Sequence, residues 1–231
     1  MHIPDGYLSP QTAITFTAAM VPIWAVALNR VKKTLRRKEV PLLAIGAAFS
    51  FTIMMFNLPL PGGSSGHAVG AVLLAILLGP WAASIGISVA LIIQALIFGD
   101  GGIMAIGANC FNMGVAMPIV GYWVNRLIRG NGELTSKRTL IAAAIAGYIG
   151  INVAALLTAV EFGSQYYWFR AVDGTPLYFM YPMKVAVIAM MSEHLILAGP
   201  VEGAITSIGL WFVGKSNPEL LDQVSTEVTR R

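Results

Sequence analysis

The sequence predicts an all-α integral membrane protein with seven transmembrane helices. Of its 231 residues, 56% are hydrophobic and only 11% are charged, a composition far more apolar than that of a soluble domain. Charge-poor tracts cover residues 11–29, 40–99, 103–125, 139–160 and 185–211. About 20 apolar residues span a bilayer, so these tracts provide six or seven helices. A β-barrel is disfavoured, because its strands alternate apolar and polar residues.

The helix count depends on residues 68–98, an apolar run that Gly79 and Pro80 interrupt. Proline disfavours helix at the residue before it and lacks an N–H group, so the run is either one kinked helix or two helices. Of the 15 Lys and Arg residues, 13 fall within 30–38, 126–138 and 215–231. Cytoplasmic loops are enriched in these residues. All three clusters lie on one side of the membrane only if residues 68–98 form two helices.

Seven helices then place the amino terminus outside and the carboxyl terminus in the cytoplasm. We expect one membrane domain over residues 1–231, with an extracellular tail at 1–9, helices within 10–214 and a cytoplasmic tail at 215–231. A helix from His67 to Gly79 is too short to cross the bilayer, so we expect His67 in a recess of the outer face. No basic leader precedes Tyr7, so we expect Met1 to be the mature amino terminus.

Residue 2 is one of only three histidines, and its position next to the terminal amine predicts a metal chelate. The Met1 amine and the His2 backbone nitrogen close a five-membered ring on a metal, and that nitrogen and the His2 Nδ1 close a six-membered ring. Nitrogen donors in a square plane suit Ni(II) or Cu(II). Residues 4–6 are expected to turn the tail back, and His67 is a candidate fourth donor. Alternatively, His2 is solvated and His67 caps or packs against a helix.

Two pairs of polar residues are candidates for the surroundings of this site. Asn109 and Asn112 lie near the outer end of a predicted membrane helix, where polar groups often mark a site. Hydrogen bonding between helices is an equally good interpretation. Ser64 and Ser65 could orient a ligand imidazole or begin the helix at His67.

Further polar groups leave several interpretations open. Glu193, His194 and Glu202 lie in the last predicted helix and should face protein, because an uncompensated carboxylate in lipid is costly. They fit either a metal or proton pathway, or structural hydrogen bonds and partner contacts. Asp100 could join the outer cluster or cap a turn. Cys110 and the eleven methionines favour Cu(I) chemistry only weakly, because Met is an ordinary filler of apolar cores.

Four segments resemble those of a known family. They are MHIPDG at 1–6, GGSSGHAVGA around His67, GDGGIMAIGANCFNMG at 99–114 and SEHLILAGPVEG at 192–203. Together they resemble the NikM/CbiM substrate-binding subunits of energy-coupling-factor (ECF) transporters, over nearly the whole chain. The amino-terminal segment is more similar to the nickel branch than to the cobalt branch.

The resemblance implies uptake of Ni(II), or alternatively Co(II), with the amino-terminal nitrogens of Met1 and His2, the His2 side chain and His67 as ligands. It implies six core helices plus an extra amino-terminal helix, in a prokaryotic cell membrane. The implied partners are a transmembrane coupling subunit, cytoplasmic ATPases and a small accessory membrane subunit, with neither nucleic acid nor an organic cofactor. The chain has no G-x-x-x-x-G-K-[ST] phosphate loop, so it cannot hydrolyse ATP by that route.

Two other functions are compatible with the sequence. Residues 63–66 fit the short G-x-S-G pattern of rhomboid-like intramembrane proteases, with Ser65 as nucleophile and His194 as base. The rest of that family's signature is missing. A stand-alone ion channel or secondary transporter is the other alternative.

Overall fold

The described residues of the computed structural model are 1–60, 64–130, 132–133 and 136–216, and only the backbone is described for 58–60 and 64–65. The helical elements are α1 (Pro10–Thr34), η1 (Arg37–Glu39), α2 (Val40–Met54), α3 (Ala71–Leu78), α4 (Pro80–Ile93), η2 (Gln94–Phe98), α5 (Ile106–Asn109), η3 (Cys110–Ala116), α6 (Met117–Arg129), α7 (Lys137–Trp168), α8 (Met183–Glu193), η4 (His194–Ala198) and α9 (Gly199–Ser216). The π-helical turns η2, η3 and η4 continue the α-helices that they adjoin. The described residues therefore form seven helical segments, in agreement with the prediction.

Four helical stretches of the described residues are long and apolar enough to cross a membrane. They are Pro10–Thr34, Pro80–Phe98, Lys137–Trp168 and Met183–Ser216. The predicted class, an all-α membrane protein, is confirmed. The other segments lie between these stretches, and α3 is the shortest of them with eight residues.

The predicted start of the third helix at His67 is wrong, because α3 begins only at Ala71. Gly70 adopts φ +74°, a left-handed conformation that interrupts the helix. The carboxylate of Glu202 in α9 accepts hydrogen bonds from the N–H groups of Val69 and Gly70. The segment that carries His67 is therefore held in a non-helical conformation by a residue far along the chain.

A small antiparallel hairpin precedes this segment. Strand β1 (Leu58–Leu60) pairs with β2 (Ser64–Gly66), with Leu58 opposite Gly66. The sequence did not predict it, because strands of three residues leave no clear periodicity. The hairpin leads directly into His67 and so helps to determine where that side chain lies.

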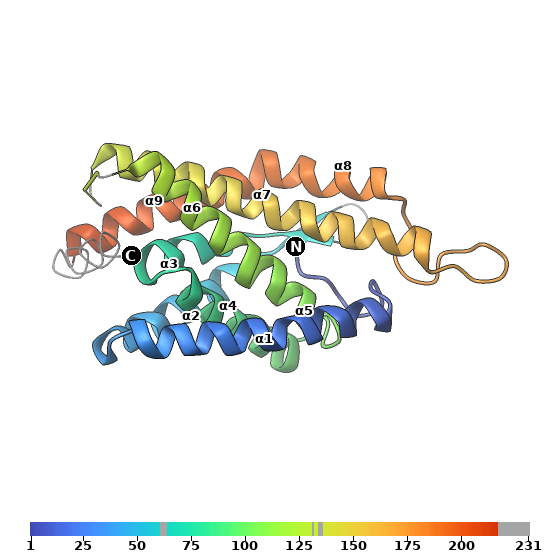
Figure 1. Ribbon diagram of the computed structural model, residues 1–231. Coiled ribbons are helices and arrows are strands. Elements are labelled where there is room, and N and C mark those ends of the chain that lie inside the picture. Colours follow the sequence, from blue (N-terminus) through green and yellow to red (C-terminus); the bar gives the residue numbers. More distant parts are fainter. Residues whose placement is uncertain (61–63, 131, 134–135, 217–231) are drawn as a thin grey trace.

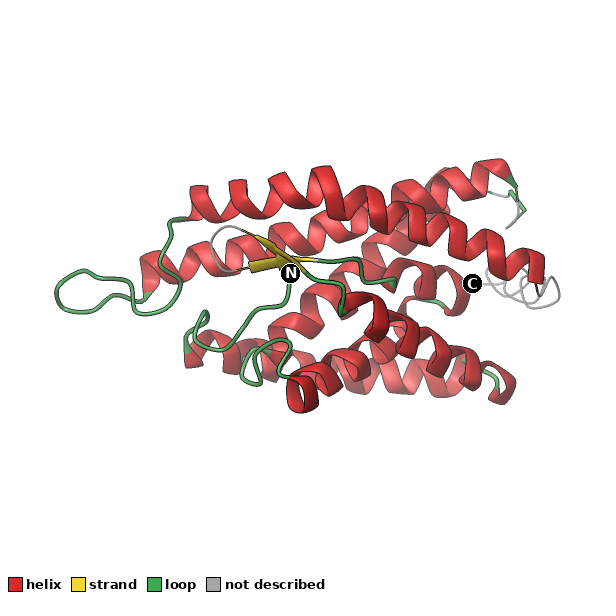
Figure 2. Cartoon of the chain, turned by 180° about the vertical axis from the view of Figure 1, so that it is seen from behind, coloured by secondary structure: helices red, strands yellow, loops and turns green. Residues whose placement is uncertain are grey.

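The helices form two layers around α3 (Figure 1). Helix α7 packs against α6, α8 and α9, whereas α4 packs against α1, α2 and α3. Helix α3 lies between the layers, and seven of its eight residues are buried. The amino terminus lies in the middle of the molecule in both views (Figures 1 and 2). The tail therefore enters the bundle.

The described residues of the three basic clusters share one end of the molecule. Helices α1, α6 and α9 all end there, and the loop between α7 and α8 lies at the opposite end (Figure 1). The last turns of these helices carry Lys32 and Lys33, Arg126 and Arg129, and Lys215. This is the distribution on which the predicted orientation depends.

Candidate metal site

The amino-terminal tail is buried inside the bundle. The side chains of Met1 and Ile3 are fully buried, and His2 is only 5% exposed. The predicted turn is confirmed, because the Tyr7 N–H donates to the Pro4 carbonyl at 3.4 Å and Gly6 adopts φ +86°. The turn directs the first residues back between the helices.

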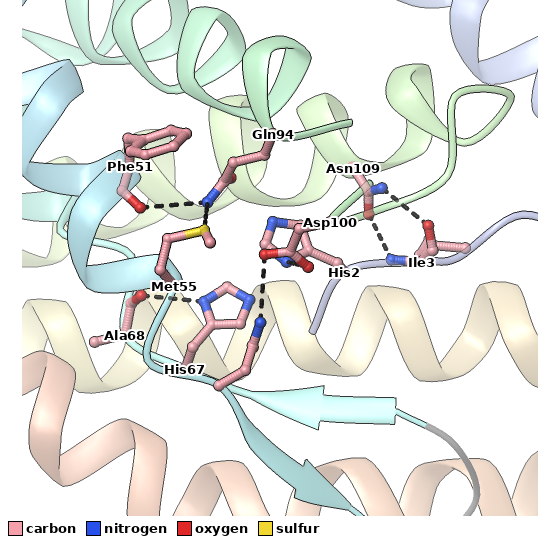
Figure 3. A network of polar contacts seen from close by, with 10 residues as sticks. His2, Ile3, Phe51, Met55, His67, Ala68, Gln94, Asp100 and Asn109 are labelled. Atoms are coloured by element: carbon pink, nitrogen blue, oxygen red, sulfur yellow. Dashed lines mark hydrogen bonds and ion pairs between the residues drawn. The ribbon is translucent and has the colours of Figure 1, made fainter. Parts of the chain in front are cut away.

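Asn109 fixes the register of the tail. Its side-chain oxygen accepts a hydrogen bond from the Ile3 N–H at 2.8 Å, and its amide donates to the Ile3 carbonyl at 3.1 Å (Figure 3). The Gly102 N–H donates to the same carbonyl at 2.8 Å. These bonds hold the backbone next to His2 much as a neighbouring strand would.

Asp5 provides a second anchor. Its carboxylate accepts hydrogen bonds from the N–H groups of Ile103 at 3.0 Å and Met104 at 2.9 Å. A Cβ atom added at Gly102 would collide with Asp5 and with the Pro4 backbone. Residues 102–104 therefore form a close-fitting seat for the tail. From the sequence, Asp5 was assigned only to the turn.

His2 and His67 come together as predicted. Their rings stack with centroids 4.5 Å apart and planes at 25°. The His67 Nδ1 lies 3.1 Å from the Ala68 carbonyl oxygen (Figure 3). A carbonyl only accepts hydrogen bonds, so this contact places the ring proton on Nδ1 and leaves a lone pair on Nε2. That Nε2 is buried and has no hydrogen-bond partner among the described residues.

Burial favours the neutral form of the terminal amine. Burial lowers the pKa of the Met1 amine to about 5, although the negative charges of Glu193 and Asp100 oppose the shift. Burial also lowers the pKa of His2 below its usual value, with Asp100 opposing it. Neutral amine and imidazole nitrogens have the lone pairs that a transition metal requires.

The Nδ1 edge of the His2 ring meets an acidic residue. The His2 Nδ1 lies 3.2 Å from Asp100 Oδ1, and Asn57 donates a hydrogen bond to Asp100 Oδ2 at 3.3 Å. Gln94, the first residue of η2, is fully buried and lies near the His2 ring (Figure 3). Asp100 thus belongs to the outer cluster, one of the two interpretations that the sequence allowed.

The acidic residues of the last helical segment contact the segment around His67. Glu202 Oε2 accepts from the Val69 N–H at 2.7 Å, and Oε1 accepts from the Gly70 N–H at 3.0 Å. The Glu193 carboxylate lies against Gly66, so closely that an added Cβ there would collide with it. His194 Nδ1 lies 2.6 Å from Glu193 Oε2. These contacts favour the structural interpretation for Glu202.

The remaining predicted residues lie in different places. Asn112 donates to Thr158 Oγ1 at 3.1 Å and to Glu161 Oε2 at 2.9 Å, and so joins η3 to α7. Ser64 and Ser65 lie in β2, but their side chains are outside the described residues. Among the described residues, no three His, Cys, Asp or Glu side chains gather as a metal site. A metal beside His2 and His67 would therefore need backbone or terminal nitrogens to complete its ligands.

The sequence matches a known family over most of its length. Residues 2–220 match the family CbiM, described as the cobalt uptake substrate-specific transmembrane region. The chain belongs to the NikM/CbiM family. The match covers His2, His67 and all the helices described above.

One relative is the fused nickel transport protein NikMN of Rhodobacter capsulatus, which is 52% identical to this chain over 221 residues. The alignment covers 96% of this chain and 64% of that protein. The cobalt transport protein CbiM of Geobacter sulfurreducens is 32% identical over 96% of this chain and 61% of its own length. This chain therefore spans a little under two thirds of both relatives.

A solved structure shares the fold. The crystal structure of a truncated transition metal transporter superimposes with a TM-score of 0.89 and 54% sequence identity. The superposition covers 94% of this chain and 99% of that one. Membership in the NikM/CbiM family, which the sequence motifs predicted, is thus confirmed.

Proposed function

We propose that this chain is the substrate-binding membrane subunit of an ATP-driven ECF importer for Ni(II), with Co(II) as the alternative substrate. Its partners would be a transmembrane coupling subunit, cytoplasmic ATPases and a small accessory membrane subunit in a prokaryotic cell membrane. The chain itself would bind and carry the ion without catalysing a reaction. Higher identity to the nickel transport relative, 52%, than to the cobalt relative, 32%, supports nickel.

The ion would be held by four nitrogens: the Met1 amine, the His2 backbone nitrogen, His2 Nδ1 and His67 Nε2. The observation that carries this proposal is the buried His67 Nε2, which has no hydrogen-bond partner among the described residues and belongs to a ring stacked on His2. A buried polar atom without a partner is costly. A metal ion between the two histidines and the terminal amine would supply that partner.

The orientation belongs to the proposal as well. The basic residues in the last turns of α1, α6 and α9, which lie at one end, support a cytoplasmic location for that end. The loop between α7 and α8 and the exposed turn at residues 5–6 would then face outside. The ion would reach the site from outside, and the ATPases would drive its release inward through the coupling subunit.

Metal analysis of the purified chain without an affinity tag tests the binding. Mass spectrometry should first show that Met1 is retained and unmodified. We expect one Ni(II) per chain after equilibrium dialysis, with tighter binding than for Co(II). Tighter binding of Co(II) would favour the cobalt alternative, and absence of both would contradict the proposal.

Transport needs a separate test in liposomes. We expect radioactive Ni(II) to accumulate only when the chain is reconstituted with its coupling subunit, ATPases and accessory subunit, and only with ATP. Transport by this chain alone in liposomes without ATP would favour a channel or secondary transporter.

A further inference from the structure

Asp100 lies on the nitrogen of His2 that the proposed metal chelate requires. Its Oδ1 is 3.2 Å from His2 Nδ1, the atom that closes the six-membered ring of the chelate. His2 is buried, and neither of its ring nitrogens has a partner with full hydrogen-bond geometry among the described residues. A buried imidazole nitrogen therefore points towards a carboxylate oxygen without being satisfied by it.

The separation of these two atoms suits two ligands of one ion. First-row divalent ions bind imidazole nitrogen and carboxylate oxygen at about 2.0–2.2 Å, so two such ligands at a right angle lie about 3 Å apart. The observed 3.2 Å is close to that value. One ion could therefore contact Asp100 Oδ1 and His2 Nδ1 together with little movement of either side chain.

Asp100 also connects the buried site to the surface. Its side chain is 21% exposed, whereas that of His2 is 4% exposed. Gly99, which ends η2 in a left-handed conformation, and the hydrogen bond from the Asp100 N–H to the Gln94 carbonyl at 3.1 Å fix its backbone. Asn57 donates to Oδ2, which leaves Oδ1 directed at His2.

We propose that Asp100 is the capture ligand through which a divalent ion reaches the four nitrogens. The hydrated ion exchanges a water molecule for Asp100 Oδ1 and then binds His2 Nδ1. The terminal amine and His67 Nε2 then join, and the metal displaces the proton of the His2 backbone N–H, which passes to water. The carboxylate leaves the ion as these nitrogens bind. Every step replaces one ligand by another and changes no oxidation state. This role rests on the proposed function.

Stopped-flow absorption of Ni(II) binding, recorded on the purified chain in detergent, tests this role. We expect Asp100→Asn to lower the association rate constant about tenfold, because it removes the negative charge that attracts and first binds the cation. The spectrum at saturation should match that of the wild type, and Asp100→Glu should restore most of the rate. Unfolding temperatures of the variants check that they are folded.

Asp173→Asn is the matched control, because it removes the same charge from the exposed loop between α7 and α8. The Asp173 carboxylate accepts hydrogen bonds only from Thr175 among the described residues, and we expect the wild-type association rate. An unchanged rate in Asp100→Asn, or an equal decrease in Asp173→Asn, would overturn the capture role. A changed spectrum at saturation would overturn it too, because Asp100 would then be a permanent ligand. If the wild type bound no Ni(II), the proposed function itself would fail.

Discussion

The imidazole rings of His2 and His67 lie face to face, 4.5 Å apart, in the interior of the helix bundle. Neither residue belongs to a helix. His2 lies on a tail that hydrogen bonds of Asn109 and Asp5 hold in place. His67 follows the hairpin, and Val69 and Gly70 just after it donate hydrogen bonds to Glu202. The site is thus built from two irregular segments, each held by hydrogen bonds from a distant part of the chain.

Replacing His67 by glutamine should abolish tight Ni(II) binding. The variant lacks one of the four proposed nitrogens, and changes to groups that only support metal ligands already cost about 10- to 100-fold in affinity. We therefore expect a decrease of more than about 100-fold in calorimetric titrations. His194→Gln is the control, because it removes another buried imidazole that is not a proposed ligand. If the two variants bound Ni(II) equally well, His67 would not be a ligand.

The two asparagines of the π-helical region should behave differently. Asn109→Ala removes two hydrogen bonds to Ile3, each of which contributes about 1 kcal/mol. Without these bonds, about 2 kcal/mol of the binding free energy of Ni(II) is used to order the tail. The affinity should then fall about 30-fold. Asn112→Ala loses contacts with Thr158 and Glu161 and should lower the unfolding temperature with little effect on affinity per folded protein. The reverse pattern would contradict the proposed clamp.

Glu202 should contribute strongly to stability. Replacing it by alanine leaves the buried N–H groups of Val69 and Gly70 without their acceptor. An unsatisfied buried group costs about 1–3 kcal/mol, so we expect a loss of about 3 kcal/mol in the free energy of unfolding. Glu202→Gln keeps an acceptor oxygen and should lose less than half as much. Denaturation in detergent, followed by tryptophan fluorescence, measures both, and equal losses would show that the acceptor is unimportant.

The close fit at Gly102 gives a steric test of tail docking. An added methyl group in Gly102→Ala would collide with Asp5 and Pro4. We expect the tail to be displaced, with Ni(II) affinity reduced and the amino-terminal residues open to limited proteolysis. Gly46→Ala is a useful control, because its methyl group would meet the flexible end of Leu74 instead. Wild-type affinity in Gly102→Ala would mean that the tail need not sit against residues 102–104.

Much of this arrangement was predictable from local patterns. The apolar tracts indicated the helices, and Gly79 with Pro80 separated α3 from α4. The position of His2 beside the terminal amine was enough to indicate a chelate, because ring sizes follow from covalent connectivity alone. Its meeting with His67 followed from the helix count, because that count put both residues on one face of the membrane.

The remaining features depend on contacts between distant residues. The left-handed Gly70 and the late start of α3 arise with hydrogen bonds to Glu202, which no local pattern reveals. The side chain of Asn109 binds the backbone of Ile3, whereas the similar Asn112 faces α7. Their three-residue spacing in sequence gave no reason to distinguish them. The paired strands beside His67 are too short to produce a periodic signal.

The proposed site depends above all on the terminal amine of Met1 as a metal ligand. Two glycines added before Met1 keep His2 and His67 but convert the Met1 amine into an amide and shift the terminus by two residues. A single added glycine is unsuitable, because a histidine in third place forms a square-planar chelate of its own with the new amine and two amide nitrogens. Ni(II) binding to this extended chain should be compared with binding to the untagged chain by calorimetry and absorption spectroscopy. We expect the extended chain to lose tight binding and the square-planar spectrum, with an unchanged unfolding temperature in the absence of metal. Undiminished binding with the same spectrum would show that the amine is not a ligand.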